Sequence, residues 1–309
     1  MDEGLRILAE ASTWYCDGNF NLSLKHFMQL YVIRVPKNDF FITAVYCLLE
    51  RKTTSNYETM FKIIIEKCEE QNLFPDPRFL HIDFEKAVIT AASNIFGSEL
   101  EIRGCFYYIC QSTFRKIQDL GLQNIYMNDD KFSHFCSMID SLAFLPLERV
   151  HEGMDFLKQT SISEAHDLLS YFDTTYVNGS YRRVGAGMNI KLRKTNPLFL
   201  PKTWNVFEAT LNSENRTNNI CEAWNNRFTH LVGHSHPTIW VLIKKIKLDF
   251  GADRTKIALS STGQTMKKSK MNQKNIRLET LCKRIHNSEL SVEEFLSQVG
   301  HNIRTRPRL

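Results

Sequence analysis

The first fifty residues alternate between apolar-rich runs and short polar breaks, a pattern typical of β-strands. Three runs rich in Phe, Tyr, Val and Ile cover about residues 11–20, 27–35 and 40–49. The breaks are short, namely Lys25-His26 and then 36–39. Because short connections join strands that run in opposite directions, we predict an antiparallel meander at the start of the chain.

After residue 50 the pattern changes to helices that alternate with short strands. A helix is predicted by one 3.6-residue apolar stripe: Tyr57, Met60, Phe61, Ile64 and Cys68. Two prolines then precede a short strand over 78–82 that ends on Asp83. Three more elements are predicted: a helix over 84–95, a strand over 101–106 and a helix over 109–120. The order βββαβαβα predicts an α/β fold with a mixed sheet covered by helices.

From about residue 123 to 215, helical stripes replace the strand pattern, which predicts a mainly helical insertion. Two such stripes are Phe132, Phe135, Ile139, Leu142 and Ala165, Leu168, Leu169, Phe172. The segment 177–200 carries several glycines and is predicted to be rich in loops. Helical periodicity returns around Trp224 and Trp240, and Ser291-x-x-Glu294 predicts a capping box before a last helix.

These patterns divide the chain into four predicted parts. Residues 1–122 form the first part of the core and 123–215 the helical insertion. Residues 216–250 provide a helix that completes the core, and 251–309 form a basic C-terminal helical region with a tail.

Composition places the chain among ordinary globular proteins. Of its 309 residues, 43% are hydrophobic and 24% are charged, and no run reaches the roughly 20 apolar residues of a membrane span. The N-terminus lacks a secretory leader, so we expect a soluble intracellular protein without a membrane partner. Eight cysteines without a Cys-x-x-Cys pair favour reduced core thiols over disulfides or structural zinc.

The net charge of +5 is mild, but the basic residues cluster late in the chain. Three segments carry them: Lys244-Lys245-Ile-Lys247, Lys267-Lys-Ser-Lys270 and Arg304-Thr-Arg-Pro-Arg308. A solvated face and a disordered end are the plain interpretation of such clusters. The alternative is contact with phosphates, for which Lys244, Lys245 and Lys247 are the candidates.

Three carboxylates are the candidate chemistry: Asp17 in the first predicted strand, Asp83 at the end of the fourth, and Glu222 in a distant helix. Each has a plain alternative. Asp17-Gly18 is a common turn pair, and Asp83 stands where a helix N-cap would be. Glu222 falls opposite an apolar stripe that includes Ile220 and Trp224, so periodicity alone makes it solvent-facing.

Other polar and aromatic residues near these acids also have structural interpretations. Helix capping is the preferred role, over phosphate contact, for four asparagines: Asn218, Asn219, Asn225 and Asn226. Trp224 and Trp240 lie on apolar stripes and are assigned to the core rather than to base stacking. His81 and Glu85 flank Asp83 and are interpreted as a strand residue and a first-turn acid, not as ligands.

Several local strings together resemble the transposase domain of Mutator-like elements, which belongs to the Asp-Asp-Glu class and has a ribonuclease-H-like core. Asp17-Gly-Asn-Phe20 is similar to the segment around the family's first acid, and His81-Ile-Asp83-Phe-Glu-Lys-Ala87 to the segment around the second. Further matches follow in the family's order: Tyr171–Tyr176, Pro197–Phe199, Trp204-Asn205, Arg216-Thr-Asn218-Asn219, Glu222, Trp224 and His236-Pro237.

The resemblance implies a nuclear enzyme of DNA recombination. Asp17, Asp83 and Glu222 would be its catalytic acids and would bind two Mg²⁺ or Mn²⁺ ions. Such an enzyme cuts DNA at transposon ends and joins the freed 3′-hydroxyl to target DNA. The alternative function is a domesticated, catalytically silent module that binds DNA or protein. The oligomeric state stays open, a homo-oligomer included.

Two departures from the family pattern support the alternative. The family carries Cys-x-x-His after the second acid, whereas this chain has Cys105-Phe-Tyr-Tyr108, and a phenol offers no imidazole nitrogen. Family members also carry an upstream zinc-coordinating DNA-binding domain, and no Cys/His spacing in this sequence replaces it. We therefore interpret the chain as a catalytic core alone.

Overall fold

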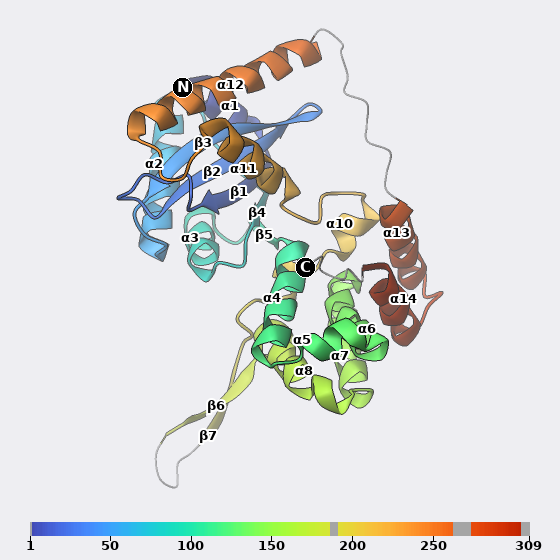
Figure 1. The fold of residues 1–309 in the computed structure, drawn as a ribbon. Helices are drawn as coiled ribbons and strands as arrows, with labels where there is room; N and C mark the ends of the chain where they lie inside the picture. The colour runs from blue at the N-terminus through green and yellow to red at the C-terminus, as the bar shows by residue number, and fades with distance from the viewer. Residues whose placement is uncertain (1, 186–190, 262–272, 304–309) are drawn as a thin grey trace. The chain divides into compact units, whose positions relative to one another are not determined.

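A computed structural model describes residues 2–185, 191–261 and 273–303 and divides the chain into two compact units (Figure 1). The first unit comprises 1–103 and 217–269, and the second comprises 104–216 and 270–309. The domain boundaries predicted at residues 122, 215 and 250 remain predictions. The basic clusters at 267–270 and 304–308 lie outside the described residues.

The first unit is an α/β structure built on a five-stranded mixed sheet. Its strands are β1 (Thr13–Asn19), β2 (Gln29–Lys37), β3 (Phe40–Leu49), β4 (Phe79–Ile82) and β5 (Glu101–Gly104). Their order in the sheet is β3-β2-β1-β4-β5, with β1–β2 and β2–β3 antiparallel and β1–β4 parallel. The helices are α1 (Asp2–Glu10), α2 (Thr54–Glu69), α3 (Lys86–Phe96), α11 (Asn219–Val232) and α12 (Ile239–Ser261).

The predicted meander and the helix after it are confirmed. The buried residues of α2 are the five of the predicted stripe. Helix α1 was not predicted from the sequence. It is nonetheless amphipathic, with Ile7 and Leu8 buried in the core.

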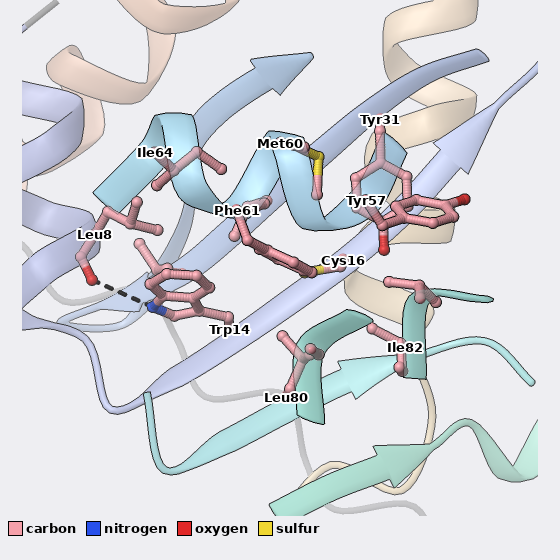
Figure 2. Packing of buried hydrophobic residues seen from close by; sticks show 14 of the residues in the cluster. Leu8, Trp14, Cys16, Tyr31, Tyr57, Met60, Phe61, Ile64, Leu80 and Ile82 are labelled. Carbon is pink, nitrogen blue, oxygen red and sulfur yellow. Dashed lines mark hydrogen bonds between the residues drawn. The ribbon is translucent and has the colours of Figure 1, made fainter. Parts of the chain in front are cut away.

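The alternation of side chains along β1 and β2 separates two cores, one on each face of the sheet. On one face, Trp14 and Cys16 pack with Phe61 of α2, and the Trp14 indole donates to the Leu8 carbonyl at 3.2 Å (Figure 2). On the other face, Val32 packs with Trp224 of α11. Asp17 follows Cys16 in the strand and therefore points to the α11 face.

Helix α12 is held to the first unit by buried aspartates. Asp249 accepts hydrogen bonds from the Trp224 indole (2.8 Å) and the Tyr46 hydroxyl (2.7 Å), and Asp253 accepts one from the Thr43 amide (3.1 Å). The core assignment of Trp224 is confirmed, whereas that of Trp240 is wrong, because 78% of Trp240 is exposed. The buried side of α12 carries polar groups, which an apolar stripe cannot reveal.

The second unit is mainly helical. Its longer helices are α4 (Phe106–Asp119), α5 (Gln123–Asn128), α6 (Asp130–Ser141), α7 (Val150–Gln159), α8 (His166–Phe172), α13 (Gln273–His286) and α14 (Val292–Ile303). The two predicted helical stripes are buried, which confirms them. The capping box is also confirmed: the Ser291 amide donates to Glu294 at 3.0 Å, and the Glu294 amide donates to the Ser291 hydroxyl at 3.2 Å.

The segment predicted to be rich in loops contains a β-hairpin in its place. Strands β6 (Ser180–Val184) and β7 (Lys191–Thr195) pair antiparallel and form a separate two-stranded sheet. The strand pattern was missed because both faces of this hairpin are exposed, so polar and apolar residues do not alternate.

The cysteines and the lengths of the helices bear on the expectations drawn from composition. All eight cysteines are free thiols, and six of them are buried: Cys16, Cys68, Cys105, Cys136, Cys221 and Cys282. Among the described helices, none combines the length and apolarity needed to cross a bilayer.

Candidate functional site

Asp17 lies inside strand β1 and not in a turn, so the turn interpretation of Asp17-Gly18 is wrong. Asp17 pairs with Val32 and Gly18 pairs with Tyr31 in the antiparallel ladder. Glycine is favoured next to Asp17 because a Cβ at position 18 would lie 2.1 Å from the Gln29 side-chain oxygen, so the buried Gln29 side chain would have to move. Gly18 thus reflects close packing on the face of β1 that is opposite to Asp17.

The Asp17 carboxylate is 7% exposed and receives two hydrogen bonds. The Gly18 amide donates to Oδ1 at 2.8 Å, and the Asn225 amide group donates to Oδ2. Burial, together with the negative charge of Glu222, raises the pKa of Asp17 to about 6, although the two hydrogen bonds and the charge of Lys52 oppose the shift. Asp17 therefore exchanges its proton near the lower end of the physiological pH range.

Helix α11 presents a polar stripe to β1, formed by Asn218, Glu222 and Asn225 at spacings of four and three residues. Asn218 donates to the Cys16 carbonyl at 2.9 Å, and Asn225 donates to Asp17. Residues at this spacing share one helix face. Asn218 does occupy the N-cap position of α11, although its side chain donates to β1 and forms no capping hydrogen bond. The capping interpretation of Asn225 is wrong, because Asn225 lies within the helix.

Glu222 is half-buried, which contradicts the solvent-facing position that periodicity alone gave it. Its Oε1 atom is buried and accepts no hydrogen bond from the described residues. Burial also raises the pKa of Glu222. The apolar stripe of α11 is narrower than assumed because Ile220 is only half-buried, so Glu222 lies at the edge of the packed face.

Asp83 follows directly after strand β4, as predicted. The N-cap of α3 is Glu85, so the capping interpretation of Asp83 is wrong. Burial raises the pKa of the Cys16 and Cys221 thiols, and the charges of both Asp17 and Asp83 raise these pKa values further. The two aspartates therefore act on a common region between β1 and the start of α11.

One cation lies close to these acids. Lys52 forms an ion pair of 2.6 Å with Glu85, and its charge lowers the pKa of Asp17. Burial and, after it, the charge of Glu85 raise the pKa of Tyr57, whose hydroxyl accepts a hydrogen bond from Gln29 at 2.6 Å. His81 is buried and stacks on Tyr15 at 4.3 Å, in agreement with its interpretation as a strand residue.

The donor set fits a divalent cation in part. Asp17 and Glu222 interact electrostatically, and the buried Glu222 oxygen without a hydrogen-bond donor matches the oxygen ligands that Mg²⁺ prefers. Within the described residues, no three acidic, histidine or cysteine side chains stand close enough together to hold one ion. The arrangement therefore provides two acids beside each other and the third in their electrostatic neighbourhood.

The remaining predicted site residues fall in both units. Lys244, Lys245 and Lys247 lie on α12 of the first unit, where Lys244 and Lys247 are exposed. Asn219 is the exposed first residue of α11. Three family-motif positions belong to the second unit: Cys105, Tyr108 and Arg216.

The motif residues of the second unit have structural contacts there. Cys105 is buried before α4, and the half-buried Tyr108 packs edge-on against Tyr107. Arg216 donates to Asn275 at 2.6 Å, and burial lowers its pKa.

Two residues of the site were not assigned to it from the sequence. Asn225 was assigned to helix capping, although its spacing of three residues from Glu222 was the available signal. Lys52 lies between the meander and α2 without any pattern, and only its contacts reveal its position beside the acids.

The sheet and its helices define the first unit as an α/β structure, and comparison with known proteins is compatible with that class. Residues 13–112 match the family model described as the MULE transposase domain, a segment that contains Asp17 and Asp83. This match supports a transposase-related function and therefore interaction with DNA. No curated protein and no solved structure matches the chain.

Proposed function

We propose that this protein is a transposase-derived DNA nuclease and strand-transfer core of the Asp-Asp-Glu class. Asp17, Asp83 and Glu222 would be its catalytic acids and would hold two Mg²⁺ or Mn²⁺ ions. When bound, such ions supply activation of the attacking oxygen and stabilisation of the leaving oxygen in phosphodiester cleavage. The nucleus is the compartment expected for this activity.

One observation carries the proposal: a buried carboxylate, Asp17, and two half-buried ones, Asp83 and Glu222, come from distant parts of the chain to a region with little opposing charge. Burial raises the pKa of both Asp17 and Glu222, and the charge of Glu222 raises that of Asp17 further, while Lys52, the neighbouring cation, is already paired with Glu85. Carboxylates that share a site without full neutralisation are typical of cation-binding and catalytic positions. The match of residues 13–112 gives independent support for the transposase class.

The sheet supports the assignment of a ribonuclease-H-like core. The order β3-β2-β1-β4-β5 combines an antiparallel meander with a parallel β1–β4 pair. The first acid lies on β1, and the second follows β4. Adjacent parallel strands bring the acids at their carboxyl ends to the same edge of the sheet, as this chemistry requires.

The residues of the chain would divide the work as follows. Asn225 and Gly18 orient the Asp17 carboxylate, and the packing of α11 holds Glu222 beside it. Lys244, Lys245 and Lys247 would contact phosphates and make DNA binding depend on salt. The protein would supply position and charge, without a covalent nucleophile.

Nicking of a supercoiled plasmid in Mn²⁺, beside duplex binding in EDTA, tests this function. We expect Asp83→Asn and Asp17→Asn each to abolish nicking and to leave binding within about twofold. Asp76→Asn removes an exposed acid from the same unit and should nick like the wild type. Wild-type nicking by either site variant would exclude these acids as catalytic, and binding without nicking by the wild type would favour the catalytically silent module.

A further inference from the structure

The hairpin of β6 and β7 carries an unusual concentration of positive charge. Five of its ten strand residues are basic, namely Arg182, Arg183, Lys191, Arg193 and Lys194. The sequence has no Asp or Glu between Asp173 and Glu208. None of the five cations forms an ion pair with any residue that the structure describes. Their charge is therefore not neutralised within the fold.

The register of the hairpin places like charges opposite each other. Arg182 pairs directly with Arg193, and Val184 with Lys191 two residues along on the same face. Like charges directly opposite each other on one face destabilise a sheet. On the other face, Tyr181 lies opposite Lys194, and the tyrosine is 68% exposed. The repulsion between these cations thus destabilises the hairpin, and the fold offers no compensating ion pair among the described residues.

The base of the hairpin is held firmly by the second unit. Gly179, at φ 75°, is required there because a Cβ would lie 2.0 Å from the Thr195 carbonyl oxygen. Just before the hairpin, the hydroxyl of the buried Tyr176 donates a hydrogen bond to the Ser112 hydroxyl at 2.8 Å, and the Tyr176 carbonyl accepts one from the Trp204 indole at 2.9 Å. Just after the hairpin, the Phe199 ring stacks on the Tyr176 ring with 5.8 Å between the ring centroids. A fixed base therefore carries an exposed pair of strands that extends away from the helices of this unit (Figure 1).

We propose that the hairpin is a DNA-binding arm whose Arg182, Arg193 and Lys191 face contacts the phosphates of a duplex. The choice of DNA among polyanions rests on the proposed function. The shape supports it, because the major groove of B-DNA is about 12 Å wide and admits a two-stranded ribbon. The deep, narrow major groove of duplex RNA does not admit side chains in this way.

If this face of the hairpin contacts phosphates, the DNA affinity should depend on salt concentration by a predictable amount. Each strand of the hairpin is roughly 17 Å long, which is enough to follow a few phosphates along the groove wall. A contact that neutralises one phosphate contributes about 0.9 to the slope of log affinity against log salt. Removing Arg182 and Arg193 should therefore reduce that slope by about 2.

The test measures binding of the full chain to a 30-base-pair fluorescent duplex in EDTA over a series of salt concentrations. We expect Arg182→Gln/Arg193→Gln to weaken binding about tenfold at low salt and to reduce the slope, with an unchanged or higher thermal midpoint. The higher midpoint follows from relief of cross-strand repulsion and shows that the loss is not unfolding. Arg182→Lys/Arg193→Lys keeps the charge and should keep the slope.

The matched control Lys62→Gln/Lys131→Gln removes two exposed cations away from the hairpin and should leave the slope near that of the wild type. The proposal that the hairpin binds DNA is overturned if the salt slope of the hairpin variant is unchanged, or if the control variant loses as much slope as the hairpin variant. Tighter binding to a duplex RNA of the same length overturns the choice of DNA. Metal-dependent nicking is scored separately at saturating DNA, so that its absence counts against the proposed function and not against the arm.

Discussion

Asn225 of helix α11 donates a hydrogen bond to the carboxylate of Asp17 in strand β1, across 208 positions of sequence. The same asparagine accepts a hydrogen bond from Asn19 at 3.1 Å. This contact places the helix that carries Glu222 against the strand that carries Asp17. This hydrogen bond therefore links two elements that carry candidate acids, beside the Asn218–Cys16 hydrogen bond and the apolar packing of α11.

Replacing Asn225 with alanine should raise the pKa of Asp17 above about 6. The lost hydrogen bond favours the charged carboxylate, and hydrogen bonds to charged groups contribute about 1.5–3 kcal/mol, so a rise of about one to two pKa units is expected. Titration of side-chain carboxyl carbons by NMR measures it. Asn226→Ala changes an exposed neighbour and should leave the titration unaltered.

Glu222→Gln should move the pKa of Asp17 in the opposite direction. The negative charge of Glu222 raises that pKa, so its removal should lower it toward the ordinary value of 3.8. The same NMR titration measures the change, with the exposed Glu99→Gln as the control. An unshifted Asp17 would show that the two carboxylates do not interact.

Binding of Mn²⁺ should weaken as pH falls through 6. A ligating carboxylate must lose its proton, and the pKa of Asp17 is raised to about 6, so affinity should decline by roughly tenfold per pH unit below that value. Isothermal titration calorimetry between pH 8 and 5 checks this. In Asp17→Asn the residual affinity should lose the pH dependence that centres on 6. A wild-type affinity that stays constant over this range would exclude Asp17 as a ligand.

Asp140 of the second unit should make stability decrease with rising pH. Burial raises its pKa from 3.8 to about 7, although Thr113 donates to it at 2.7 Å. Between pH 4 and 7 Asp140 is therefore protonated in the folded state and ionised in the unfolded state. Its contribution to the free energy of unfolding is fully present below pH 4 and is lost as pH rises through 7. Urea unfolding should show that Asp140→Asn is relatively more stable at pH 8 than at pH 5, whereas the exposed control Asp119→Asn should show no such difference.

Gly18→Ala should destabilise the first unit by about 1–3 kcal/mol, since the new methyl group would lie 2.1 Å from the Gln29 oxygen. Gln29→Ala alone should cost about 1 kcal/mol through its lost hydrogen bond to Tyr57. In the Gln29→Ala background the glycine substitution should be nearly neutral. Additive costs in this double-mutant cycle, measured by urea unfolding, would show that the two side chains do not compete for space.

The sequence by itself determined the meander, the strand that ends before Asp83 and the helices α2, α6 and α14. Each of these has a local signal, either an apolar period or a capping pair, because burial on one face repeats at the spacing of the element. The acids Asp17 and Asp83 were selected for the same reason, since their positions follow from the order of the elements.

The tertiary structure alone decided how polar groups meet. Asn225 and Lys52 acquire their roles from contacts with residues far away in the chain, which no period encodes. The exposed hairpin was missed because neither of its faces is buried, and Trp240 was misplaced because the buried side of α12 carries Leu242, Asp249 and Asp253 instead. Periodicity reports burial, whereas the partners of buried polar side chains are fixed only when distant elements pack together.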